Sequence, residues 1–184
     1  NYVFIGLSLF SLGLFKKIIF ADTMAIYASA AFAAAENGVI LTIYEAWLGS
    51  LAYTMQLYFD FSGYSDMALG LAIMFGFKLP VNFFSPYKAT NIADFWRRWH
   101  ITLSRMIREY LWDPISLAMT RLAVRSRYGV IRFFIVTSVA PTLFTFFWIG
   151  LWHGAGWNFI VFGMLHGSYI TTYNLWSQLK QKYK

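Results

Sequence analysis

Residues 129–151, GVIRFFIVTSVAPTLFTFFWIGL, determine the fold class, because they are long and apolar enough to cross a bilayer as a helix. A spanning helix needs about 20 mostly apolar residues, and this segment contains one charged residue, Arg132. Pro141 can kink such a helix, which neighbouring helices tolerate in a membrane. Outward from this segment, further apolar stretches predict spans at about 2–20, 39–59, 64–77 and 157–176.

The composition of the whole chain agrees with this reading. Of its 184 residues 59% are hydrophobic and 12% are charged, whereas a soluble domain has about 25% charged residues. A solvated surface cannot be built from so few charges, so we expect an all-α, multi-spanning membrane protein with interfacial amphipathic helices. The chain begins at Asn1 without an initiating Met and ends at Lys184 just after an apolar segment. We therefore expect an internal fragment, with residues 1–184 forming part of one larger membrane domain.

Positive charge predicts the orientation of the chain. The net charge is +7, and the stretch 78–132 contains most of the basic residues. Further lysines follow in the tail, two predicted spans later, so both regions lie on one side of the membrane. Basic loops are retained in the cytoplasm, so we expect residues 78–128 to be cytoplasmic or interfacial.

Residues 91–111 have the pattern of an amphipathic helix. Apolar residues recur at i, i+3, i+4 and i+7 on one face, and the charges lie on the opposite face. Asn91 is the expected N-cap. A basic helix with two tryptophans on its apolar face is typical of the membrane interface, and it makes nucleic acid an unlikely partner. His100 lies at the edge of the apolar stripe, where it is either an anchoring side chain or a site residue.

Two other histidines lie in apolar segments. His153 is flanked by glycines in GLWHGAGW, residues 150–157, which suits either a substrate-accessible site or a plain turn between helices. His166 lies within a predicted span, and we expect it to be packed and hydrogen-bonded. The spacing of the histidines matches no metal-binding motif and the chain has no Cys, so no metal site is expected.

Two carboxylates interrupt the apolar stretch 39–77. Asp60 and Asp66, with hydroxyls and a glycine between them, predict a break near residues 60–65 and an irregular, protein-buried hinge. A proton relay and pairing with Arg or Lys of the basic loop are both possible for these carboxylates, and pairing is the simpler interpretation.

Four stretches of the chain, in order, resemble motifs of one known family: FSLGLFKKIIFAD (10–22), QLYFDFSGYSDMALGLAIMFGFKLPVNFFSPY (56–87), DFWRRWHITLSRMIREYL (94–111) and GLWHGAGWNFIVFGMLHG (150–167). This family is the membrane-bound O-acyltransferases, and the branch most resembled is the bacterial alginate O-acetyltransferase type, which is similar to the teichoic acid D-alanyl transferases. The resemblance implies a helical fold enclosing a tunnel, with His153 as the essential histidine and His100 as the second motif residue. The turn after Tyr110 departs from the family pattern, which leaves the local loop and its partner open.

The resemblance also implies an activity. It is acyl transfer, of an acetyl group above all, from a cytoplasmic thioester donor to hydroxyls of an exported polysaccharide such as alginate. The donor, acetyl-CoA or an acyl-carrier protein, is a co-substrate, and no bound cofactor is expected. The resemblance further implies the bacterial inner membrane and an extracytoplasmic acetyltransferase partner. The alternative is a non-catalytic transporter or channel subunit that uses the same histidines as a polar pathway. Besides His153 and His100, we expect these residues to line the tunnel or support it: Trp99, Trp152, Asp60, Asp66, Arg97 and Arg98.

Overall fold

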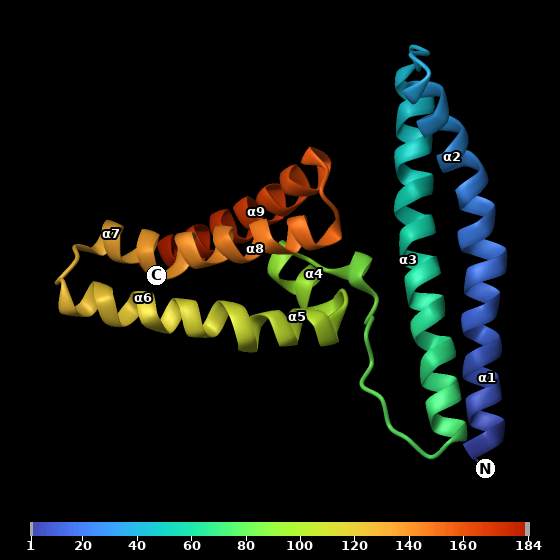
Figure 1. Cartoon of the computed structure of the whole chain (residues 1–184), viewed down its shortest axis with the longest axis horizontal. Coiled ribbons are helices and arrows are strands. Elements are labelled where there is room, and N and C mark those ends of the chain that lie inside the picture. Colours follow the sequence, from blue (N-terminus) through green and yellow to red (C-terminus); the bar gives the residue numbers. More distant parts are fainter. Residues whose placement is uncertain (1, 183–184) are drawn as a thin grey trace. The chain divides into compact units, whose positions relative to one another are not determined.

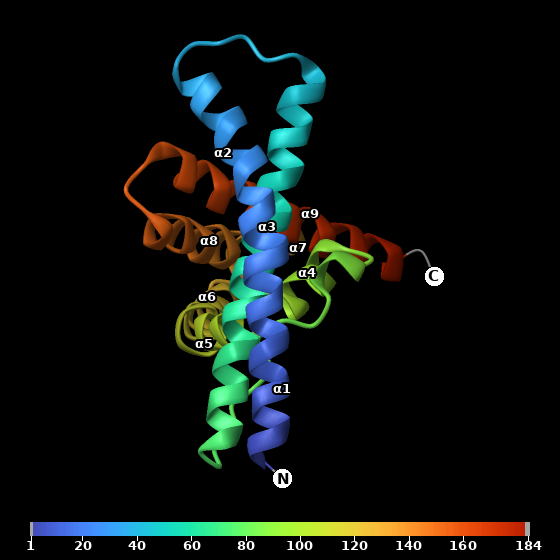
Figure 2. The ribbon, with the colours of Figure 1, turned by 90° about the vertical axis from the view of Figure 1, so that its right-hand side faces the viewer.

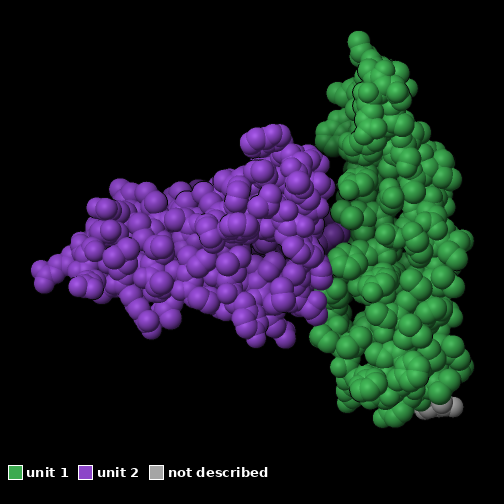
Figure 3. Space-filling model, in the orientation of Figure 1, with its two compact units in different colours: residues 1–83 green, residues 84–184 purple. Residues whose placement is uncertain are grey.

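The computed structural model describes residues 2–182, and the chain divides into two compact units, Asn1–Phe83 and Phe84–Lys184 (Figure 3). The described residues contain helices and turns but no strand, so the all-α prediction is confirmed.

Unit 1 is a helical hairpin. Helix α1 (Tyr2–Phe15) continues through a π-helical turn (Lys16–Ala21) into α2 (Asp22–Glu36), and α3 (Ile43–Met74) runs back along both (Figures 1 and 2). Thr42 starts α3 with a capping box: its hydroxyl accepts a hydrogen bond from the Glu45 N–H, and its own N–H donates to the Glu45 carboxylate. Both exchanges satisfy backbone groups that a helix start leaves unpaired.

Glycines bring the two arms of the hairpin into backbone contact. A Cβ atom on Gly13 would lie 2.5 Å from the carbonyl oxygen of Gly63, and one on Gly70 would lie 2.5 Å from the carbonyl oxygen of Gly6. The two glycines of each arm are seven residues apart, so they lie on one face of their helix. Small residues of this kind allow close helix packing in membranes.

The predicted break near residues 60–65 is wrong, because α3 runs without interruption from Ile43 to Met74. The polar and small residues that suggested a break are instead buried within the hairpin. Ser62 is 1% exposed, Ser65 is 8% exposed, and Gly63 packs against Gly13. Small side chains at a helix contact look like loop residues in the sequence, since both environments favour them.

Unit 2 consists of longer helices preceded by a short one. A 3₁₀ turn (Pro86–Lys88) leads into the short α4. The longer helices contain π-helical turns, so that several labelled segments form one continuous helix (Figure 1). In chain order the segments are α4 (Ile92–Arg98), α5 (Ile101–Ile107), the π-turn Arg108–Trp112, α6 (Asp113–Arg125), α7 (Val130–Phe134), the π-turn Ile135–Val139, α8 (Ala140–His153) and α9 (Trp157–Lys182).

Pro141 explains how α6 is attached to the helix that follows it. Proline has no N–H, so the carbonyl of Thr137, four residues earlier, loses its partner within the helix. That carbonyl accepts a hydrogen bond from the Ser116 hydroxyl at 3.0 Å. Nearby, the indole N–H of Trp112 donates to the Thr142 hydroxyl at 3.2 Å. The proline therefore frees an acceptor that links two helices.

Within the part of the chain that the structure describes, two continuous helices are long and apolar enough to cross a membrane: Tyr2–Glu36 and Val130–His153. The second covers the segment 129–151 from which the fold class was predicted, so a long apolar helix there is confirmed. The first contains the predicted span 2–20. The predicted spans 39–59 and 64–77 are not two separate helices, because α3 covers Ile43–Met74 without a break. The span at about 157–176 lies within α9, and its crossing of a membrane stays a prediction.

Candidate active site

The segment 91–111 supplies His100, but it is not one helix as predicted. Asn91 caps α4 as expected, since its side-chain oxygen accepts a hydrogen bond from the Asp94 N–H at 2.8 Å. The helix then stops at Arg98 and restarts at Ile101. An amphipathic pattern alone predicts continuity, and the sequence has no Gly or Pro here to indicate the break.

Hydrogen bonds from outside the helix stabilise this break. The carbonyl of Arg98 accepts from the N–H of Phe84 at 2.9 Å, and the carbonyl of Trp99 accepts from the Ser104 hydroxyl at 3.2 Å. His100 itself takes a left-handed conformation, φ +43° and ψ +56°. This conformation costs a residue with a side chain about 1–2 kcal/mol. Backbone strain of this kind is concentrated at functional sites. His100 lies at the corner between α4 and α5.

His153 is the last residue of α8 and is surrounded by aromatic rings. Its ring centroid lies 5.0 Å from Trp152, 5.6 Å from Phe162 and 6.5 Å from Phe159. A Cβ atom on Gly154 would lie 2.7 Å from the Cδ2 atom of Phe159, so the glycine admits this ring. The glycines around His153 were expected to leave room for a substrate or a turn. At Gly154 the Phe159 ring occupies part of that room.

His100 and His153 share one electrostatic environment. Partial burial lowers the pKa of His100, and the nearby charge of His153 lowers this pKa further. Both histidines that the sequence singled out lie in unit 2.

The other predicted support residues of unit 2 have different surroundings. Trp99 stacks on Phe95 with ring centroids 5.6 Å apart. Arg98 donates from Nε to Asp94 Oδ2 at 2.9 Å, which fixes it along α4. The side chain of Arg97 is 70% exposed, and Trp152 is 67% exposed.

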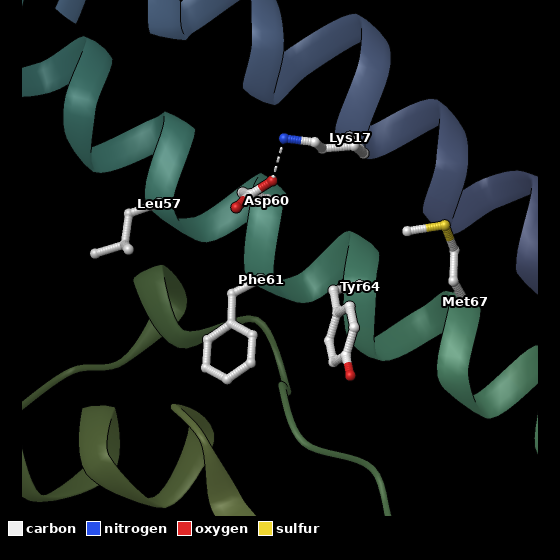
Figure 4. Close-up of a pocket in the computed structure, with 6 residues that line it drawn as sticks. All are labelled: Lys17, Leu57, Asp60, Phe61, Tyr64 and Met67. Carbon is white, nitrogen blue, oxygen red and sulfur yellow. Dashed lines mark ion pairs between the residues drawn. The ribbon is translucent and has the colours of Figure 1, made fainter. Parts of the chain in front are cut away.

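Asp60 and Asp66 lie in unit 1, and their partners differ from those predicted. Lys16 Nζ lies 2.6 Å from Asp66 Oδ2, and Lys17 Nζ lies 2.6 Å from Asp60 Oδ1. Lys17 also pairs with Asp22 at 2.9 Å. The predicted pairing of Asp60 and Asp66 with the basic loop is therefore wrong. Their lysine partners lie on the other arm of the hairpin. Lys17 and Asp60 border an open pocket of about 320 Å³ (Figure 4).

Sequence reasoning overlooked an aromatic stripe on α9. Phe159, Phe162 and His166 are spaced i, i+3, i+7, which places them on one helix face. Phe162 lies 4.6 Å from His166, and Trp96 of α4 lies 5.2 Å from His166. The Nδ1 atom of His166 is buried and has no hydrogen-bond partner, contrary to the hydrogen-bonded side chain that we expected. The spacing was visible in the sequence, but it looked like ordinary packing.

Several known proteins have sequences similar to this chain. The peptidoglycan O-acetyltransferase of Helicobacter pylori is 45% identical over 185 residues, covering 100% of this chain and 32% of that protein. The probable alginate O-acetylase AlgI of Azotobacter vinelandii is 46% identical over 165 residues, 90% of this chain and 30% of that protein. The teichoic acid D-alanyltransferase of Bacillus subtilis is 36% identical over 135 residues, 72% of this chain and 32% of that protein. The chain thus spans about a third of the length of these relatives.

The model of the membrane-bound O-acyltransferase family matches residues 2–184. This match covers both units, including the corner at His100 and the helix end at His153. The chain therefore belongs to the membrane-bound O-acyltransferase family.

Proposed function

We propose that the protein containing this chain is an O-acyltransferase of the bacterial inner membrane. It moves an acyl group, preferably acetyl, from a cytoplasmic thioester to hydroxyls of an exported polysaccharide. Acetyl-CoA and an acyl-carrier protein are the two donors of suitable chemistry. The observation that carries the proposal is the match of residues 2–184 to the membrane-bound O-acyltransferase family, with His100 and His153 within one compact unit of the chain.

In this mechanism His153 acts as the general base. Its imidazole removes the proton from the acceptor hydroxyl as that oxygen attacks the thioester carbonyl. The tetrahedral intermediate then collapses, the carbon–sulfur bond breaks, and the leaving thiolate takes the proton from the imidazolium. The products are the ester and the free thiol, and His153 returns to its neutral form. The exposed position of His153 at the end of α8 suits a group that must meet two substrates.

His100 assists at the same centre. A lowered pKa keeps its imidazole neutral near pH 7, so one ring nitrogen carries a proton and the other does not. The N–H can donate a hydrogen bond to the developing oxyanion or orient the acceptor.

The named relatives support an exported polymer as acceptor, since they include a peptidoglycan O-acetyltransferase and a probable alginate O-acetylase. A cytoplasmic donor and an extracytoplasmic acceptor need a route across the bilayer, for which this family's membrane fold is suited. An extracytoplasmic acetyltransferase that receives the acyl group is the partner we propose.

Replacing His153 tests the proposal. His153→Ala in the full-length protein should lower the acetyl content of the exported polymer about 10²–10⁴-fold, the usual contribution of general base catalysis. Membrane abundance should stay normal. Trp148→Phe, on the same helix, is a matched control, because the Trp148 ring packs on Phe144 and Phe147 of α8. Normal acetylation in His153→Ala at normal abundance would refute the assignment. Proteoliposomes that move substrate without cleaving the thioester would instead indicate a transporter.

A further inference from the structure

We propose that Trp96 and His166 are positioning residues, which hold the segment carrying His100 against the helix pair carrying His153. This inference rests on the proposed function and extends it to two residues for which no role has been assigned. It is carried by the ring contacts that cross between α4 and the α8–α9 pair.

The segment that carries His100 has little core of its own. Neither α4 nor α5 contains a fully buried residue among those described. The corner between them is bounded by Trp99 in an extended conformation and by His100 in a left-handed one. Contacts made by neighbouring residues therefore contribute to the position of His100 within unit 2.

Trp96 makes such contacts four residues before His100. Its ring meets Phe146 of α8 edge to face, with centroids 5.2 Å apart and an interplanar angle of 69°. It meets His166 of α9 at 5.2 Å and 83°, again edge to face. This geometry is the preferred one for aromatic pairs, because the positive edge of one ring faces the negative face of the other.

The faces of α8 and α9 that contact Trp96 also carry or contact His153. Phe146 lies seven residues before His153 on α8, so both project from one face of that helix. On α9, His166 contacts Phe162, and Phe162 contacts His153 at 5.6 Å. A continuous set of ring contacts thus connects Trp96, four residues before His100 in the sequence, to His153.

Close packing of α8 on α9 makes this set of contacts rigid. A Cβ atom on Gly163 would lie 3.1 Å from the Cα atom of Gly150, and one on Gly167 would lie 3.0 Å from the Cβ atom of Phe146. Close-packed groups have little freedom to relax, so a lost ring cannot be replaced by a small shift of its neighbours.

The polar atoms of the pair indicate that shape is what matters. Trp96 Nε1 and His166 Nδ1 are both buried, and neither has a hydrogen-bond partner. The two side chains therefore interact through their rings, and an aromatic ring without a nitrogen at either position should serve equally well.

The test combines a distance measurement with kinetics in the full-length protein. Cysteines are introduced as His100→Cys and His153→Cys, any other cysteines of the protein are replaced by serine, and a short bifunctional thiol reagent links the pair in membranes. Adding Trp96→Leu or His166→Ala should lower the yield of this cross-link, whereas Trp96→Phe and His166→Phe should preserve it. Trp148→Leu, which removes a tryptophan of α8 whose ring contacts stay within that helix, is the matched control and should also preserve the yield.

In the protein with both histidines intact, Trp96→Leu should lower kcat roughly ten- to a hundredfold, as expected when catalytic groups move by about 1 Å. The KM for acetyl-CoA, used as the donor, should change much less, and Trp96→Phe should restore kcat.

Two results would overturn the inference: an unchanged cross-link yield in both Trp96→Leu and His166→Ala, or a loss in Trp96→Phe equal to that in Trp96→Leu. The cross-link yield does not depend on catalysis. Failure of the proposed acyl transfer, seen as unaltered transfer by His153→Ala, is therefore distinguishable from failure of this positioning role.

Discussion

Lys16 and Asp66 join the two arms of the hairpin in unit 1, with Nζ and Oδ2 2.6 Å apart and both side chains largely shielded, at 31% and 26% exposed. Because Gly13 and Gly63 bring the backbones together just beside this pair, the lysine needs only a short reach. A charge-assisted hydrogen bond contributes about 1.5–3 kcal/mol. We expect Lys16→Ala or Asp66→Asn to destabilise the protein by an amount in this range, measured by thermal unfolding in detergent.

The double variant provides the control for this ion pair. If the two charges act on one another, Lys16→Ala with Asp66→Asn should be less destabilised than the sum of the single variants. Strict additivity would show that the ion pair contributes nothing.

Gly13 should tolerate no side chain. A Cβ atom there would lie 2.5 Å from the Gly63 carbonyl oxygen and 2.7 Å from the Met67 N atom. Both are backbone atoms, which cannot move away by a change of side-chain rotamer. Gly13→Ala should therefore separate the arms of the hairpin and cost about 1–3 kcal/mol, as overpacking does. Gly129→Ala is the matched control, because a Cβ atom there meets nothing within 4 Å. Equal thermal stability of the two variants would contradict the packing described for the hairpin.

The pKa of His100 predicts how stability depends on pH. Burial, and then the charge of His153, place this pKa below its ordinary value of 6.5. Between the lowered pKa and 6.5 the unfolded chain binds more protons than the folded one, so stability falls as the pH is lowered through this interval. Thermal unfolding at about pH 7.5 and about pH 5.5 should show a smaller acid-induced loss in His100→Asn than in the wild type. An identical loss would mean that His100 titrates alike in both states.

The outward-facing side chain of Arg97, at 70% exposed, gives a test of orientation. If the basic stretch 78–132 faces the cytoplasm, Arg97→Cys should not react with a membrane-impermeant thiol reagent added to intact spheroplasts. The same variant should react after the spheroplasts are permeabilised, which is the control for accessibility. Ready labelling from outside would reverse the proposed orientation.

The sequence predicted the helical class and the cap at Asn91, because composition and capping chemistry are local properties. It did not predict the break at His100, since that break depends on Phe84 donating to a carbonyl fourteen residues away. The uninterrupted α3 was also missed, because Ser62 and Gly63 look alike in a loop and in a close helix contact. The partners of Asp60 and Asp66 were not predicted, because they come from another helix, and sequence spacing carries no information about which helices pair.

The shared role proposed for His100 and His153 predicts how their substitutions combine. If both imidazoles act on one transition state, removing either should disrupt the same stabilisation, and removing the second should add little. We expect His100→Ala to reduce acyl transfer strongly and the double variant to be scarcely worse than His153→Ala alone. The measurement is the rate of acetyl transfer by full-length protein in proteoliposomes, normalised to the amount inserted. Losses that multiply in the double variant would place the two histidines in separate steps, with His100 acting away from the transferred acyl group.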